Sequence, residues 1–172
     1  HCHQGFSGTN SAGLLMTRIA IERPDQPPVI ALIDALDAYQ KPLYPAASHH
    51  GIDMAALTSP GVVFAVARDA SGRVCGCGAV VLMNGYAELK RMYVPPEFRG
   101  RGLGAALLEF LEAQALAHER PLLRLETGIR QPEALRLYAR AGYAERAPFG
   151  DYLPDPNSVF MEKTLCAARR TT

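Results

Sequence analysis

The sequence lacks three features that would each point to a particular class of protein. Its 18 lysines and arginines nearly balance its 17 acidic residues, so no net charge draws it to nucleic acid or an acidic membrane. Its longest apolar run, Val74–Met83, has ten residues, too few to cross a bilayer. Its C-x-C pair, Cys75 and Cys77, matches neither a redox motif nor a zinc knuckle. We therefore expect no nucleic-acid, membrane or metal partner, and a cytoplasmic location.

The length and composition fit one globular domain. The chain has 172 residues, of which 48% are hydrophobic and 20% charged, as is usual for a soluble domain. Residues 1–15 are rich in Gly, Ser, Asn and His and are interpreted as a tag or leader. Residues 16–167 are predicted to form the domain, with 168–172 as a tail. Within it, Cys75 and Cys77 are expected to be reduced core residues on one face of a strand.

The spacing of apolar residues predicts a mixed α/β (α+β) fold. Strands are predicted at 18–23, 62–69, 73–83, 86–94, 122–127, 143–147 and 158–165, and helices at 29–40, 53–58, 104–119 and 131–142. Asn84-Gly85 is a strong signal for a hairpin turn. Strands alternate with helices only in the second half, which predicts a mixed sheet with one β-helix-β unit near its centre.

The stretch FRGRGLG, at 98–104, has the composition of an anion site. Its glycines allow close approach to the backbone, its arginines donate charged hydrogen bonds, and a helix N-terminus follows. No Gly-Lys-Ser or Gly-Lys-Thr occurs in the chain, which excludes a Walker A loop. The spacing and position also fit a dinucleotide-binding fingerprint poorly.

Two motifs together resemble the GNAT superfamily of N-acetyltransferases. Arg99, Gly102 and Gly104 match its pattern [RQ]-x-x-G-x-[GA], and QPEALRLYARAGY, at 131–143, matches A-x-x-L-Y-x-x-x-G-[FY]. The resemblance spans about residues 17–165 and is strongest to uncharacterised bacterial members. It implies a mostly antiparallel mixed sheet of about six to seven strands flanked by about four helices. It also implies acetyl-CoA as cosubstrate, with no metal.

The resemblance implies that acetyl-CoA lies along a strand end and the glycine-rich loop. Pro95 and Pro96 end the strand 86–94, so its last backbone groups are expected to be free for the pantetheine arm. Gln131 stands where the family often has Asn. The implied cofactor-binding residues are Met92, Tyr93, Val94, Arg99, Gly100, Arg101, Gly102, Leu103, Gly104, Ala105 and Gln131.

Amide formation from a thioester needs a base and an acid. Glu88 is the first candidate for the base, with Glu126 as its rival and a water chain as a third route. Strand alternation is expected to place Glu88 on one face with Lys90, Met92 and Val94; the structural alternative for Glu88 is a charge pair with Lys90 or Arg91. The resemblance implies that the Tyr138 hydroxyl reaches the sulfur of coenzyme A as the acid.

The acceptor side carries weaker signals. Tyr44, Glu126, Thr127 and Tyr152 are the predicted substrate-binding residues, whereas His49 and His50 are interpreted as a solvated loop. The predicted reaction is direct attack by a small-molecule primary amine in a ternary complex. A protein N-terminus or lysine as acceptor and a noncatalytic acyl-CoA sensor are the alternatives, and a homodimer is left open.

Overall fold

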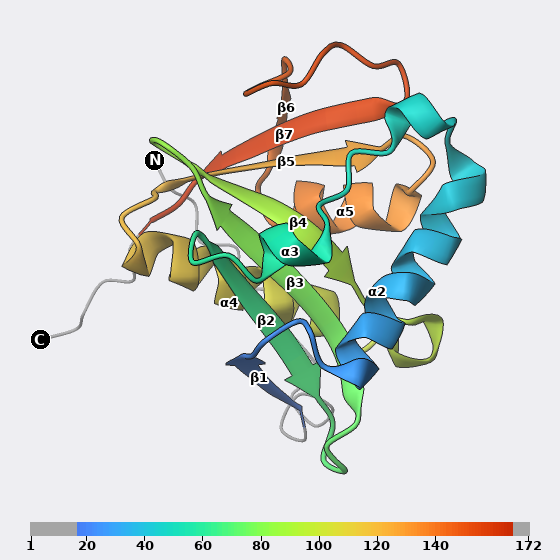
Figure 1. Ribbon diagram of the computed structural model, residues 1–172. Helices are drawn as coiled ribbons and strands as arrows, with labels where there is room; N and C mark the ends of the chain where they lie inside the picture. The colour runs from blue at the N-terminus through green and yellow to red at the C-terminus, as the bar shows by residue number, and fades with distance from the viewer. Residues whose placement is uncertain (1–16, 167–172) are drawn as a thin grey trace, which may run out of the picture.

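A seven-stranded sheet forms the centre of the computed structural model, which describes residues 17–166 (Figure 1). The strands are β1 Arg18–Ile21, β2 Val62–Arg68, β3 Val74–Leu82, β4 Ala87–Tyr93, β5 Leu122–Gly128, β6 Ala144–Arg146 and β7 Ser158–Thr164. Their order is β1-β2-β3-β4-β5-β7-β6, and all neighbours are antiparallel except β4 and β5. The predicted mixed sheet is confirmed. The predicted leader (1–15) and tail (168–172) lie outside the described residues.

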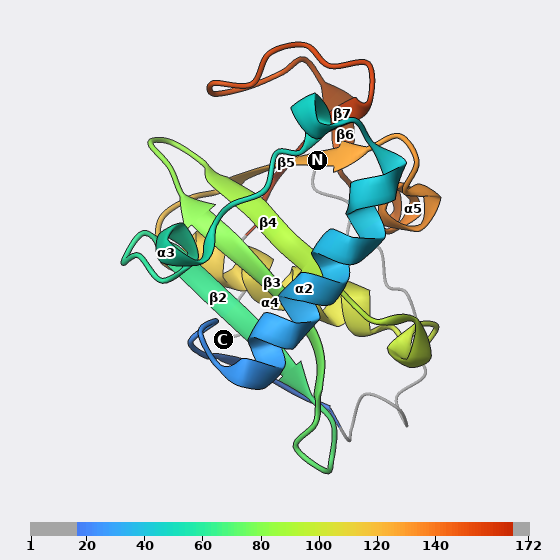
Figure 2. The same ribbon diagram turned by 45° about the vertical axis from the view of Figure 1, so that its right-hand side comes forward.

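Helices cover both faces of the sheet. The α-helices of the described chain are α2 Pro27–Gln40, α3 Met54–Leu57, α4 Leu103–Ala117 and α5 Pro132–Arg140. Helices α4 and α5 pack on one face, and α2 and α3 on the other (Figures 1 and 2). Three short 3₁₀ turns lie in the connections, at Lys41–Leu43, Ala46–Ser48 and Pro96–Phe98. No helix within residues 17–166 has the length and apolar character needed to span a membrane.

The apolar stripe of α4 fixes the position of the helix on the sheet. Leu103, Leu107 and Leu111 recur every four residues, and each is 5% exposed or less. Burying one leucine side chain stabilises a fold by roughly 1.5–3 kcal/mol. The stripe predicted from the sequence is therefore confirmed, and it also anchors the glycine-rich loop that precedes the helix.

A bulge in β3 separates the two neighbouring cysteines. The register passes from Ala67 opposite Gly76 to Arg68 opposite Val74, so Cys75 is an extra residue without a partner on β2. As a result, Cys75 packs in the core beneath α4, whereas Cys77 packs beneath α2. The expectation that they share a face is wrong. Both are buried, unbridged thiols, as predicted.

A second bulge, in β4, changes which side chains face the same way. Arg91 has φ of 57°, and the register jumps from Lys90 opposite Ala79 to Tyr93 opposite Cys77. Lys90 and Arg91 therefore both face the α2 side, where they contact residues 50–52 and α2. Met92 and Val94 pack instead in the core beneath α4. The expectation that they share a face with Glu88 and Lys90 is wrong, because the extra residue reverses the alternation.

Candidate active site

The two central strands separate where their parallel pairing ends. Strand β4 pairs with β5 from Ala87 opposite Leu123 to Leu89 opposite Leu125. Beyond this, Arg91 bulges out of β4, while β5 continues to Gly128 along its other neighbour, β7. Figure 1 shows the strands diverging, with α5 behind them. The facing strand edges therefore have backbone groups left over for a ligand.

A cavity lies at this opening, with walls from β4, β5, α5, α2 and the segment between α2 and α3. Its polar lining residues are Gln40, Tyr44, Ser48, His50, Lys90, Arg91, Glu126, Thr127, Gln131, Tyr138 and Asn157. The structure thus brings together the predicted acid Tyr138, the rival base Glu126 and the predicted substrate residues Tyr44 and Thr127. Met92 and Gln131, predicted to contact the cofactor, also line it.

The glycine-rich loop has the backbone expected of an anion site. Gly100 and Gly102 both have φ of 77°, the left-handed region that favours glycine. Helix α4 begins at Leu103, and no side chain caps its first turn. The first backbone N–H groups of the helix are therefore left for a ligand at the positive end of its dipole. This arrangement fits a pyrophosphate group, which is the role predicted for Gly100–Ala105.

The two arginines of the loop have different surroundings. Arg99 donates through Nε to the Val94 carbonyl at 2.9 Å and through Nη1 to Glu133 at 3.2 Å, which ties the loop to the end of β4 and to α5. The Val94 carbonyl is therefore not free, contrary to expectation. Arg101 is exposed beside the Phe98 ring, with 5.9 Å between guanidinium carbon and ring centroid. Direct contact of either arginine with a phosphate stays a prediction.

Tyr138 is held as a protonated phenol. It lies on α5, is 6% exposed, and packs edge-on against Tyr143 with 5.8 Å between ring centroids. Burial raises the pKa of its hydroxyl well above the usual value, and the negative charge of Glu126 acts in the same direction. A phenol in this state keeps its proton at neutral pH and can offer it in a hydrogen bond.

Glu126 is the carboxylate of the cavity lining. Its Oε1 accepts a hydrogen bond from Ser158 Oγ at 2.9 Å. Burial raises the pKa of Glu126, although the Ser158 hydroxyl and the charges of His50 and Lys90 partly oppose this. A carboxylate with a raised pKa holds a proton more readily, so it is a stronger base for an ammonium group.

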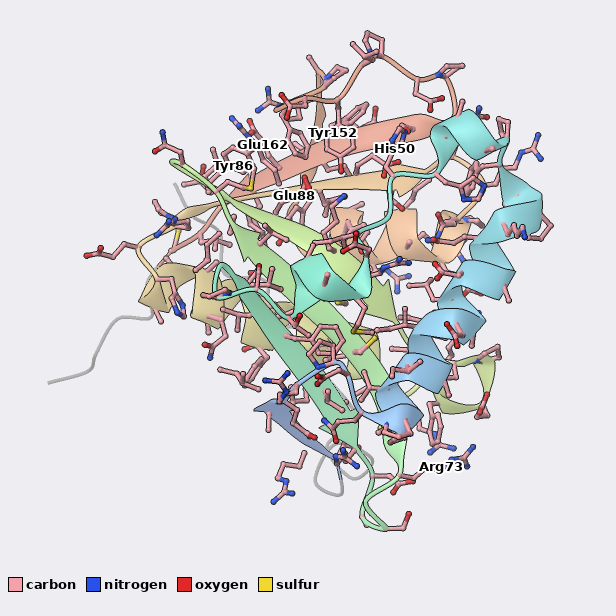
Figure 3. All side chains as sticks on the ribbon, viewed as in Figure 1. His50, Arg73, Tyr86, Glu88, Tyr152 and Glu162 are labelled. Atoms are coloured by element: carbon pink, nitrogen blue, oxygen red, sulfur yellow. The ribbon has the colours of Figure 1, made fainter. Side chains whose placement is uncertain are left out.

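Glu88 lies beside the cavity rather than in its lining. It is 7% exposed, accepts a hydrogen bond from the Tyr152 hydroxyl at 3.3 Å, and lies 3.4 Å from Lys90 Nζ. The charge pair with Lys90, the structural alternative for this residue, is therefore present. Catalysis by Glu88 and substrate contact by Tyr152 remain predictions, and Figure 3 shows the two side chains close to one another.

Tyr44 closes one end of the cavity over the end of β5. Its hydroxyl accepts a hydrogen bond from the Arg130 backbone N–H and donates to Gln131 Oε1, each at 3.2 Å. A β-carbon on Gly128 would lie 1.8 Å from that hydroxyl, so only glycine leaves room for the ring. Gln131 is thus engaged with Tyr44, and its predicted contact with the cofactor remains untested.

Three lining residues escaped the sequence interpretation. His50 was expected to be solvated, but it lines the cavity and its Nε2 lies 3.3 Å from Asp155 Oδ2. His49, its neighbour, points to the Tyr44 carbonyl instead. Lys90 and Arg91 stand together in the lining because of the bulge in β4. Strand alternation in the sequence predicts that these two neighbours face opposite sides, so it could not predict that both line the cavity.

Known proteins with similar sequences identify the family. The acetyltransferase (GNAT) domain model matches residues 60–145. An IAA acetyltransferase of Azospirillum brasilense is 48% identical over 149 residues, which are 86% of this chain and 97% of that protein. A crystal structure described as an acyl-CoA N-acyltransferase, from Klebsiella pneumoniae subsp. pneumoniae, has 43% identity and a TM-score of 0.76 over 88% of this chain and 99% of that chain.

A more distant structure shows the same fold with coenzyme A bound. The PaiA N-acetyltransferase of Thermoplasma acidophilum, solved as that complex, has a TM-score of 0.64 and 16% identity over 86% of this chain and 99% of that chain. The match at residues 60–145 contains the bulged strand β4, the glycine-rich loop and the helix that carries Tyr138. The chain therefore belongs to the GNAT family and is an N-acetyltransferase.

Proposed function

We propose that the protein transfers the acetyl group of acetyl-CoA to the primary amine of a small molecule, by direct attack in a ternary complex. The observation that carries this proposal is the shared cavity of Glu126 and Tyr138. One is a carboxylate with a raised pKa, and the other is a phenol that stays protonated. Together they supply the base and the acid that amide formation needs.

Glu126 takes the proton from the acceptor ammonium, which frees the nitrogen lone pair to attack the thioester carbonyl carbon. The C–N bond forms and the C–S bond breaks. Tyr138 donates its hydroxyl proton to the departing sulfur and takes up the second proton that the nitrogen loses as the amide forms, while Glu126 releases the first proton to solvent. The backbone groups of β4 and β5 at the opening are available to hold the pantetheine amides, and the first turn of α4 is available for the pyrophosphate.

The charges around the cavity favour a cationic acceptor. Lys90 is paired with Glu88, Arg91 with Asp37 and His50 with Asp155. Glu126 instead has a neutral partner, the Ser158 hydroxyl. The charge left without a counter-ion in the lining is therefore negative, which attracts an ammonium group.

The buried thiols support direct transfer rather than an acetylated cysteine. Burial raises the pKa of Cys77 to about 12 and also raises the pKa of Cys75. Both therefore remain thiols at neutral pH, and the thiol form is a poor nucleophile. Assembly as a homodimer stays a prediction.

The test is release of free thiol from acetyl-CoA with a panel of small amines. IAA is assayed as well, because the name of a relative contains it. We expect at least one small amine to release thiol and to gain an acetyl group, measured by mass spectrometry. Acetylation of peptides alone would favour the protein-acceptor alternative. Thermal stabilisation by acetyl-CoA without turnover on any acceptor would favour the sensor.

Tyr138→Phe tests the acid. The phenyl ring keeps the packing against Tyr143, so we expect the variant to fold and to bind acetyl-CoA as the wild type does. The loss of the proton donor should lower kcat by about 100-fold, the lower end of the range for general acid catalysis. The measurement is steady-state kinetics at saturating acetyl-CoA. Unchanged turnover by Tyr138→Phe would rule out the proposed acid.

A further inference from the structure

Two loops meet beside the cavity and contact one another directly. We call them the wall loops: residues 44–53, between α2 and α3, and residues 147–157, between β6 and β7. His50 of the first reaches Asp155 of the second at 3.3 Å, and its ring packs edge-on against Tyr152 with 5.4 Å between centroids. Asn157 Nδ2 donates to Ser48 Oγ at 3.2 Å. The wall loops therefore form one continuous wall.

Lys90 joins both wall loops to the sheet. Its Nζ donates to the His50 carbonyl at 2.9 Å and to the Tyr152 hydroxyl, and it lies 3.4 Å from Glu88 Oε2. An ammonium group has three N–H donors, and three acceptors surround this one. The side chain is 17% exposed. Lys90 is thus a fixed attachment point rather than a cation free to bind a substrate anion.

Tyr152 links its wall loop to both Lys90 and Glu88. Its hydroxyl accepts from Lys90 and donates to Glu88 Oε2 at 3.3 Å, which makes a chain of charge-assisted hydrogen bonds. The pKa of Tyr152 is raised by burial and by the charge of Glu88, so the phenol keeps the proton that it donates. Figure 3 shows His50, Glu88 and Tyr152 gathered beside β4, β5 and β7.

We propose that Lys90, Tyr152 and Glu88 form a clasp that holds the wall loops in place around the acceptor end of the cavity. These are positioning residues: they shape the acceptor site without contacting the reacting atoms. This inference rests on the proposed function for its kinetic consequence, because it assigns the clasp to acceptor binding. Breaking it leaves the opening between β4 and β5, and the loop before α4, intact.

The test compares Lys90→Met and Tyr152→Phe with matched controls in the full-length protein. Lys163→Met removes a lysine of similar burial from its pair with Glu112, and Tyr86→Phe removes a hydroxyl from the same aromatic cluster. In the clasp variants we expect the acceptor KM to rise about 10-fold, the effect of losing one hydrogen bond to a charged group. The kcat and the affinity for acetyl-CoA should change less than twofold. The acceptor KM of the double variant, Lys90→Met with Tyr152→Phe, should equal that of the single variant with the higher KM.

Hydrogen exchange gives a readout that does not depend on turnover. In Lys90→Met, amides of both wall loops should exchange at least 10-fold faster, whereas those of β5 should not change. Unchanged wall-loop exchange in both clasp variants would overturn the proposal. The proposal would also be overturned if the affinity for acetyl-CoA fell in parallel with the affinity for the acceptor. It would be overturned too if the wall loops exchanged as fast in Lys163→Met as in Lys90→Met. If no amine is acetylated by the wild type, the proposed function fails, and the exchange result still decides whether the clasp exists.

Discussion

Gly102→Asp is expected to abolish binding of coenzyme A while leaving the fold intact. Gly102 precedes the first turn of α4, at φ of 77°, a conformation that aspartate tolerates better than most residues. An aspartate at this position would place a negative charge at the start of the helix, next to the free N–H groups of the first turn. Its charge would therefore repel the pyrophosphate proposed to bind those N–H groups.

Isothermal titration with coenzyme A measures the effect. We expect the affinity to fall by at least 100-fold, or about 2.7 kcal/mol, whereas the ligand-free protein should lose only the small thermal stability that a side chain at a positive φ costs. Gly72→Asp is the matched control. Gly72 has φ of 85° in the turn between β2 and β3, and a β-carbon there would meet nothing within 4 Å. Affinity within twofold of the wild type in Gly102→Asp would show that the loop is not the anion site.

Glu126→Gln is expected to lower kcat/KM for the amine by about 100- to 10,000-fold, the range for loss of a general base. Glutamine keeps an acceptor for the Ser158 hydroxyl, so the wall of the cavity should not change. A pH profile gives a second readout. Wild-type activity should rise with pH as Glu126 loses its proton, and the variant should lack that acidic limb.

Glu88→Gln separates the two carboxylates. If Glu126 is the base and Glu88 belongs to the clasp, Glu88→Gln should raise the acceptor KM and keep the acidic limb of the pH profile. Loss of that limb in Glu88→Gln, with its retention in Glu126→Gln, would restore Glu88 as the base. Steady-state kinetics of both variants over the same pH range distinguish these outcomes.

Glu126→Gln should also stabilise the fold. Burial raises the pKa of Glu126 above the usual value of 4.5, so the folded chain binds that proton more tightly than the unfolded chain does. Stability associated with the protonated form is present at low pH and is lost as the pH rises through the raised pKa. We therefore expect Glu126→Gln to have a higher Tm than the wild type at pH 8, and the difference to shrink towards pH 4. A lower Tm at pH 8 would contradict this.

The local sequence was sufficient to predict the helices, the strands and the backbone of the glycine-rich loop. The apolar stripe of α4, the Asn84-Gly85 turn and the proline at the start of α5 depend on residues close together in the chain, and each is found where expected. The glycines at 100 and 102 likewise have the backbone angles that the loop predicted. Each of these features is determined by residues that are close to it in the sequence.

The sequence by itself determined the order of elements, the family and the position of Tyr138, because those follow from spacing along the chain. Only the tertiary structure decided which side chains share the cavity. Bulges at Cys75 and Arg91 reverse the alternation of β3 and β4, and a bulge depends on the register with the neighbouring strand. Glu126 lines the cavity from β5, whereas Glu88 turns to Lys90 and to Tyr152, which lies more than sixty positions away in the sequence.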